Sequence, residues 1–148
     1  MQHRLAAQSD AFSAFPTGTL NEDHHFIGMA TAFRPSGGLR TARDVSRWID
    51  EGRAHLHGIL QRWMAHDDVV HVEWQRQVWL PMFQFDVRTR TPRVAVGLVL
   101  IEFAGAMSHW DIARWFALPD STLSGQRPFE VLGADPASVI EAARACVR

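Results

Sequence analysis

Lysine is absent from this chain of 148 residues, so all fifteen of its basic residues are arginine. Arginine favours bidentate contacts with carboxylates and phosphates, which would suit a charged partner. A GC-rich coding bias would produce the same composition, and both explanations stay open. The formal net charge is −1. No global attraction to nucleic acid or to a membrane surface is therefore expected, and such binding would need a local patch.

Cysteine and long apolar segments are also scarce. Cys146 is the single cysteine, which excludes an intramolecular disulfide and fits a reducing compartment. The first residues lack the apolar stretch of a signal peptide. The apolar stretch 94–107 contains Glu102 and is too short to cross a bilayer. These features predict about one domain, a cytoplasmic location and no membrane partner.

Familiar catalytic and cofactor motifs are missing as well. The sequence has no phosphate-binding glycine loop, no nucleophile elbow, no Cys-x-x-Cys pair and no His-Glu-x-x-His helix motif. Histidines and acids do gather between residues 66 and 73, but without a recognised ligand spacing, and we read them as a solvated turn and strand face. We therefore predict no catalytic residues, no cofactor and no metal site, and we favour a binding protein over an enzyme.

The pattern of apolar residues predicts a mainly α fold with a small β-hairpin, a compact helical domain with an irregular N-terminal arm. Residues 1–38 form the arm, with one helical turn near residues 25–33; a partly disordered leader is the alternative. Alternation along residues 69–74 and 78–85 predicts the hairpin, with Pro81 marking an edge strand or a bulge. Residues 93–107 are apolar nearly all round and predict a central buried helix, with a buried strand as the alternative.

Residues 39–77 predict a helix pair followed by the first strand. Thr41 and Asp44 have the spacing of a capping box, Gly52 ends the first helix, and the second runs from about residue 54 to 66. The pair has the outline of a degenerate helix-turn-helix, although acidic residues dilute its basic charge. The candidate DNA-binding residues are Arg40, Arg43, Arg47 and Arg53.

Residues 78–148 contain a helix–turn–helix corner with strong boundary signals. Ser108 and Asp111 form a second capping pattern, Pro119 stops the helix that follows, and Pro128 restarts a short one. Asp135 then precedes the last helix as its N-cap. The arrangement predicts a rigid corner that offers side chains to a partner.

Three motifs follow one another in this part of the chain: Trp79-Leu-Pro-Met-Phe-Gln-Phe-Asp86, Trp110-Asp-Ile-Ala-Arg-Trp-Phe116 and Pro119-Asp-Ser-Thr-Leu-Ser-Gly-Gln-Arg-Pro128. Their order resembles the toxin-binding domain of the Xre/MbcA/ParS-type antitoxins. In that family a Pro-x-x-Gln-Phe strand precedes a helix, a Trp-Phe helix, a Pro-Asn-x-x-Leu-x-Gly-x-x-Pro turn and a final helix. Two departures are Asp120, where the family usually has asparagine, and the lack of a clear basic recognition helix in residues 39–66.

The resemblance implies an antitoxin that sterically neutralises a RES-type toxin, an NAD-consuming enzyme, and that breaks no bond itself. It implies a corner formed by Trp115, Phe116, Pro119, Asp120, Leu123, Gly125 and Pro128. Arg144 and Arg148 are further candidates for partner contact, because of their position and charge on the last helix. A homodimer is a further expectation. The alternative function is a DNA-binding regulator acting through residues 39–66.

Overall fold

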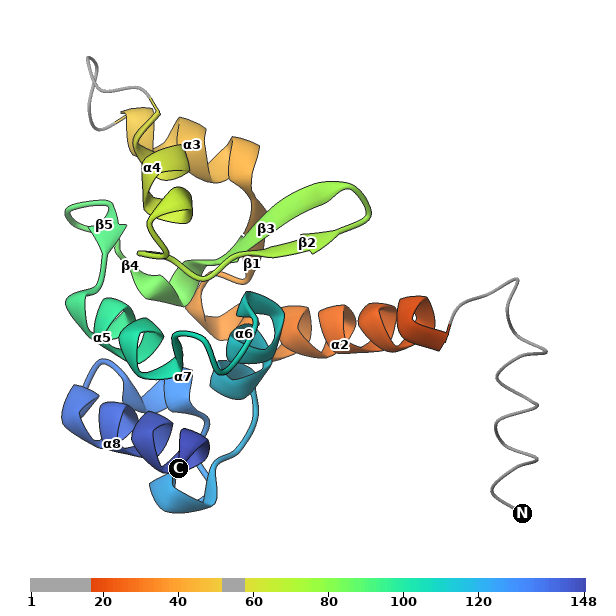
Figure 1. Cartoon of the computed structure of the whole chain (residues 1–148). Helices are drawn as coiled ribbons and strands as arrows, with labels where there is room; N and C mark the ends of the chain where they lie inside the picture. The colour runs from red at the N-terminus through yellow and green to blue at the C-terminus, as the bar shows by residue number, and fades with distance from the viewer. Residues whose placement is uncertain (1–16, 52–57) are drawn as a thin grey trace.

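The computed structural model describes residues 17–51 and 58–148, which form mainly helices around a small antiparallel sheet (Figure 1). The helices are α2 (Thr17–Phe33), α3 (Ala42–Glu51), α4 (Ile59–Ala65), α5 (Val94–Phe103), α6 (His109–Ala117), α7 (Pro128–Val131) and α8 (Pro136–Val147). The strands are β1 (Leu39–Thr41), β2 (Val72–Trp74), β3 (Gln77–Pro81), β4 (Phe85–Asp86) and β5 (Thr91–Pro92). Short 3-10 turns are η1 (Arg34–Ser36), η2 (Met82–Gln84) and η3 (Ser121–Leu123). The predicted fold class is confirmed.

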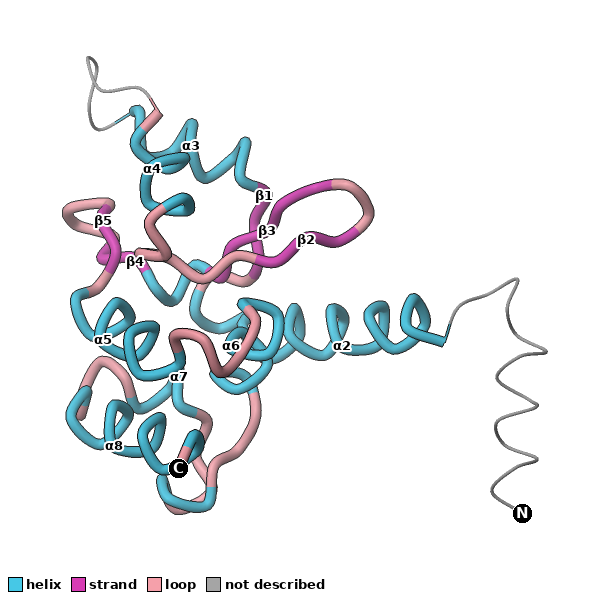
Figure 2. Tube along the Cα trace, in the orientation of Figure 1, coloured by secondary structure: helices cyan, strands magenta, loops and turns pink. Residues whose placement is uncertain are grey.

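The predicted hairpin is present, but its second strand is not an edge. Strands β2 and β3 pair across Gln75 and Arg76, which both have positive φ, and β1 pairs with the other side of β3 (Figure 2). The three-stranded order β1-β3-β2 makes β3 central. Pro81 is the last residue of β3 and directly precedes η2. The N–H that proline lacks therefore does not interrupt the ladder of hydrogen bonds. A second pair of strands, β4 with β5, forms an antiparallel ladder of its own.

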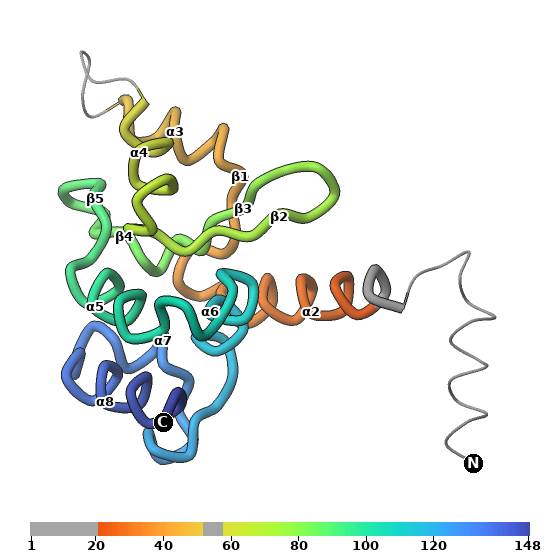
Figure 3. The backbone as a smooth tube through the Cα atoms, in the orientation of Figure 1, coloured from red at the N-terminus to blue at the C-terminus, as the bar shows by residue number. Residues whose placement is uncertain are grey.

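Helix α2 is much longer than the single turn expected near residues 25–33. Phe26, Met29 and Phe33 recur at helical spacing and are buried, and these three side chains anchor the helix on the body. Phe26 stacks on Trp74 with ring centroids 3.9 Å apart, and Nε1 of that tryptophan donates to Asp23 at 2.8 Å. The N-terminal end of α2 projects beyond the other helices (Figure 3).

Two hydrophobic cores lie on either side of the strands. The small core lies under α3 and α4 and consists of Val45, Ile49, Ile59, Leu60, Val69, Leu80, Met82 and Phe85. The main core joins α2, α5, α6, α7 and α8 to the sheet. Helices α5 and α8 lie side by side in it (Figure 3). Val69 belongs to the small core and its neighbour Val70 to the main core, so the segment before β2 connects the two.

Helix α5 is not the central buried helix that the sequence predicts. It buries Val96, Val99, Leu100 and Phe103 against the main core. Its opposite side exposes Val94, Leu98 and Ile101, which are 80%, 44% and 68% exposed. Among the described helices, none is both long and apolar enough to cross a membrane.

The predicted helix caps form as expected. The hydroxyl of Thr41 accepts from the N–H of Asp44 at 3.2 Å, and the hydroxyl of Ser108 accepts from the N–H of Asp111 at 3.1 Å. Asp135 accepts from the N–H of its third neighbour, Ser138, at 3.2 Å. Each bond satisfies a backbone donor that the first helical turn leaves free.

Candidate functional site

One carboxylate holds the corner between α6 and α7. Oδ2 of Asp120 accepts from Nε1 of Trp115 at 3.2 Å, and Oδ1 accepts from the N–H of Thr122 at 2.8 Å. The carbonyl of Asp120 accepts from the N–H of Gly125 at 2.9 Å. Gly125 has a φ of +81°, a value that residues with a β-carbon rarely adopt. Asp120 and Gly125 therefore fix the direction in which the chain leaves α6.

The predicted corner residues divide into a buried and an exposed group. The buried side chains are Trp115, Phe116, Leu123 and Pro128. The residues that reach the surface at least in part are Pro119, Asp120 and Gly125. A buried side chain cannot touch a partner without leaving the core, so the first group shapes the corner and direct contact falls to the second group and its neighbours.

The buried aromatics of the corner meet the upstream motif inside the main core. The ring of Phe83 lies 4.7 Å from that of Phe116 and 5.8 Å from that of Phe129, centroid to centroid. Phe33 of α2 packs edge-on against Phe129 at 5.1 Å. Aromatic pairs at such distances stabilise a core beyond the area that they bury. The contact between Phe83 and Phe116 thus joins the first motif to the second, and the hydrogen bond from Trp115 to Asp120 joins the second to the third.

A groove of about 380 Å³ lies beside the corner, between η3 and α8. The lining residues are Thr122, Ala137, Ser138, Glu141, Ala142 and Ala145. Most α8 residues at the groove are small, so its wall on that side carries little side-chain bulk.

The two arginines predicted to contact a partner lie on α8 and at its end. Nε of Arg144 is 2.9 Å from Oε2 of Glu102, and its Nη1 is 2.7 Å from Oε2 of Glu141. Glu102, first of all, and Glu141 raise the pKa of Arg144 above its ordinary value. Arg148 is exposed at the helix end.

No family model, curated protein or solved structure matches this chain. The resemblance to the antitoxins therefore stays a prediction, and so do the roles that it implies for the corner residues. The geometry of the corner and its groove carries the functional proposal below.

The helix pair presents three of its four candidate arginines to solvent. Arg40 on β1 and Arg43 and Arg47 on α3 are exposed. Arg47 also lies 3.8 Å from a carboxylate oxygen of Asp44, which reduces its charge locally. Arg53 and the first part of the predicted second helix lie outside the described residues. Helix α4 begins at residue 59 within the described part of the chain.

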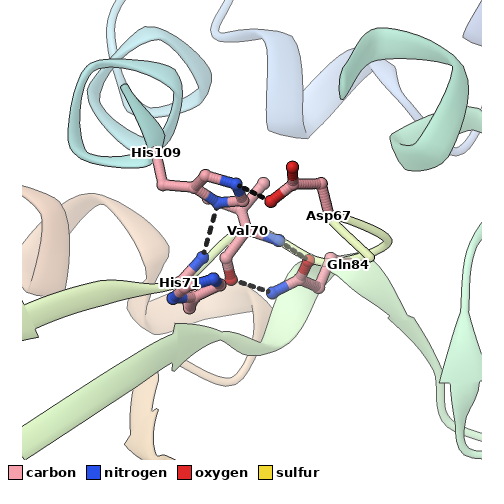
Figure 4. A network of polar contacts seen from close by, with 5 residues as sticks. All are labelled: Asp67, Val70, His71, Gln84 and His109. Carbon is pink, nitrogen blue, oxygen red and sulfur yellow. Dashed lines mark hydrogen bonds and ion pairs between the residues drawn. The ribbon is translucent and has the colours of Figure 1, made fainter. Parts of the chain in front are cut away.

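A polar cluster joins the segment between α4 and β2 to the start of α6 (Figure 4). Nε2 of His109 is 2.9 Å from Oδ1 of Asp67, and its Nδ1 accepts from the backbone N–H of His71 at 3.3 Å. The two imidazole rings are 4.4 Å apart, centroid to centroid. Burial, followed by the His109 imidazole, lowers the pKa of His71. His71 is therefore neutral at neutral pH.

Gln84 supports the same segment from below (Figure 4). Its Oε1 accepts from the N–H of Val70 at 2.7 Å, and its Nε2 donates to the carbonyls of Val70 at 2.8 Å and Pro81 at 3.0 Å. Gln84 is the buried glutamine of the Pro-x-x-Gln-Phe motif and is 0% exposed. The Gln84 amide pairs with both backbone groups of Val70, as a neighbouring strand would, and so holds residue 70 against η2.

Sequence reasoning missed the cluster because its third member is distant. Asp67 and His71 are near each other in the sequence, whereas His109 is the first residue of a helix that begins far along the chain. Only the packing of α6 beside β2 brings the three together. Gln84 belongs to a sequence motif, but no local signal shows which backbone groups it binds.

Proposed function

We propose that this chain is an antitoxin-like protein that binds a RES-type, NAD-consuming toxin and neutralises it sterically. The observation that carries the proposal is the contact between the three ordered motifs: Phe83 packs on Phe116, and Trp115 donates a hydrogen bond to Asp120. A cytoplasmic location and the absence of catalysis by this chain belong to the same proposal.

The binding surface in this proposal is the exposed side of the corner together with the groove along α8. The backbone around Asp120 and Gly125 is fixed by hydrogen bonds, so little conformational entropy is lost when a partner docks. The groove accepts apolar or small side chains, and Arg148 offers charge to acidic groups at its edge. Arg144 binds such a group by exchanging its pairing with Glu102 or Glu141. An interface of ordinary size, roughly 800 Å² on each protein, would extend over the corner and α8 together.

Co-expression with the product of a neighbouring gene of the RES type tests the proposal. We expect a complex that co-purifies and elutes together in gel filtration, and cells that keep their NAD and grow when both proteins are made. Toxicity without rescue, together with separate elution of the two purified proteins, would count decisively against it.

The substitution Gly125→Val tests where the interface lies. Valine at a φ of +81° is strained by about 1–3 kcal/mol, so the turn distorts. We expect loss of the complex with most of the far-ultraviolet circular dichroism retained. Gly133→Val is the matched control, because a β-carbon there meets no atom within 4 Å and no positive φ is required. Equal binding by both variants would place the interface elsewhere.

DNA binding through the helix pair is the second candidate function. It rests on the exposure of Arg43 and Arg47, one turn apart on α3. A salt-dependent mobility shift with the chain's own upstream DNA, lost in the Arg43→Ala, Arg47→Ala double variant, would support it. A wild-type chain that gives no shift at low salt removes it.

Self-association is the remaining part of the proposal. The exposed stripe of Val94, Leu98 and Ile101 on α5 is an apolar surface that a second copy could cover. Light scattering should then give the mass of a dimer for the wild type and of a monomer for Leu98→Glu. A monomeric wild type at high concentration would exclude self-association through this surface.

A further inference from the structure

The cluster of Asp67, His71 and His109 has the composition of a transition-metal site. Each residue offers one ligand atom, and these atoms lie within 4.8 Å of one another. Four ligands around a zinc ion at about 2.0–2.1 Å stand roughly 3.3 Å apart in a tetrahedral arrangement. The carboxylate of Asp67 and Nε2 of His109 are already 2.9 Å apart. The atoms therefore need to shift by about 1.5 Å at most to surround one ion.

We propose that Asp67, His71 and His109 bind one divalent transition-metal ion, with zinc as the best match. Two imidazoles and one carboxylate form a nitrogen-rich donor set, which suits zinc and its neighbours in the first row. Magnesium and calcium prefer sets made of oxygen atoms and are poorly served here. Water completes the coordination.

The imidazole of His71 already lies beside that of His109. Its side chain is half-buried, and the centroids of the two rings are 4.4 Å apart. The two nitrogen ligands are therefore close together before any ion binds.

His109 changes its protonation pattern when the ion binds. Without an ion, the N–H of His71 donates to Nδ1 of His109, so the ring proton lies on Nε2 and faces Asp67. Zinc takes the place of that proton at Nε2, and the neutral ring carries its proton on Nδ1 instead. The 3.3 Å contact with the N–H of His71 must then open. It is longer than an ordinary N–H hydrogen bond, so the cost of opening it is small.

The charges around the cluster favour a cation overall. His109 is the first residue of α6, and the positive end of a helix disfavours a cation modestly. The negative charge of the Asp67 carboxylate offsets the effect of the helix end. Asp67 lies just beyond α4 and has a φ of +57°. Bound zinc would tie the segment after α4 to the first turn of α6, and so connect the two sides of the fold.

Titration of the untagged, chelator-treated full chain with zinc chloride tests the proposal. We expect one zinc per chain with micromolar or tighter affinity, a rise in the melting temperature, and no such rise with magnesium. His71→Gln and His109→Gln should each weaken zinc binding by more than the roughly 10–100-fold that loss of a supporting contact costs. His66→Gln is the matched control, since His66 is an exposed neighbour outside the cluster, and it should bind as the wild type does.

Cobalt substitution keeps the test decisive if a histidine variant folds poorly. Cobalt in the wild type should give the intense visible absorption of a four-coordinate site, and Asp67→Asn, which alters an exposed side chain, should change that spectrum. A wild type that binds no zinc at micromolar concentration, or variants that all bind it equally, would overturn the proposal. Neither outcome depends on the toxin partner.

Discussion

Replacement of Gln84 by methionine should strongly destabilise the fold. Methionine has a similar length but cannot replace the hydrogen bonds to the N–H and carbonyl of Val70 and to the carbonyl of Pro81. Each buried group left without a partner costs about 1–3 kcal/mol. Three such groups cost roughly 3–6 kcal/mol, allowing for some relaxation, a large part of the 5–15 kcal/mol that keeps a typical domain folded.

Urea unfolding followed by far-ultraviolet circular dichroism measures this loss. The matched control is Gln77→Met, at the exposed start of β3, which should change the free energy of unfolding by less than about 0.5 kcal/mol. Gln84→Glu adds a second test. Its carboxylate would face the carbonyls of Val70 and Pro81, so its destabilisation should shrink as the pH falls and the group becomes protonated.

Hydrogen exchange locates the effect. The amide of Val70 should lose protection first in Gln84→Met, because its acceptor is gone. A Gln84→Met variant that unfolds within about 1 kcal/mol of the wild type, with unchanged denaturant dependence, would refute the view that Gln84 locks residue 70 to η2.

Two further changes test the packing and the capping. Phe33→Ala should lower the free energy of unfolding, measured in urea, by about 3–5 kcal/mol, since the ring is 0% exposed and packs on Phe129. The control is Ile27→Ala on the same helix, which should cost almost nothing because Ile27 is 58% exposed. Equal losses in the two variants would contradict the burial of Phe33. Asp135→Ala should lower the melting temperature at neutral pH. Hydrogen bonds from Ser138 lower the pKa of Asp135 below its ordinary 3.8. The stability that the Asp135 carboxylate contributes is therefore present above that value and is lost as the pH falls through the lowered pKa. A difference in melting temperature between variant and wild type that persists in strong acid would exclude this cause.

Local signals in the sequence predict what local contacts determine. The caps at Thr41, Ser108 and Asp135 form because each side chain binds a backbone N–H within its own first helical turn. The prolines and the glycine of the corner likewise act on the backbone at their own positions. These signals place the helix boundaries of the C-terminal half without knowledge of the packing.

Contacts between distant segments explain the parts that sequence reasoning missed. Strand β1 has three residues and exists because β3 pairs with it. Helix α5 reads as apolar on all sides, and only its packing against α8 shows which side is buried. His109 joins Asp67 and His71 solely through the position of α6. The spacing of the buried residues of α2 indicates only its last two turns, from Phe26 to Phe33, and the mostly polar residues before them carry no apolar period.

The contact between Phe33 and Phe129 has a consequence for the order in which the protein can be made. Helix α2 leaves the ribosome before Phe129, whose ring packs on Phe33, has been added. At roughly 5–20 residues per second the interval between Phe33 and Phe129 is on the order of ten seconds. During that time the nascent chain carries Phe33 without its contact to Phe129. Ribosome-bound chains that stop before α7 should therefore recruit chaperones, and chains released at that length should be degraded.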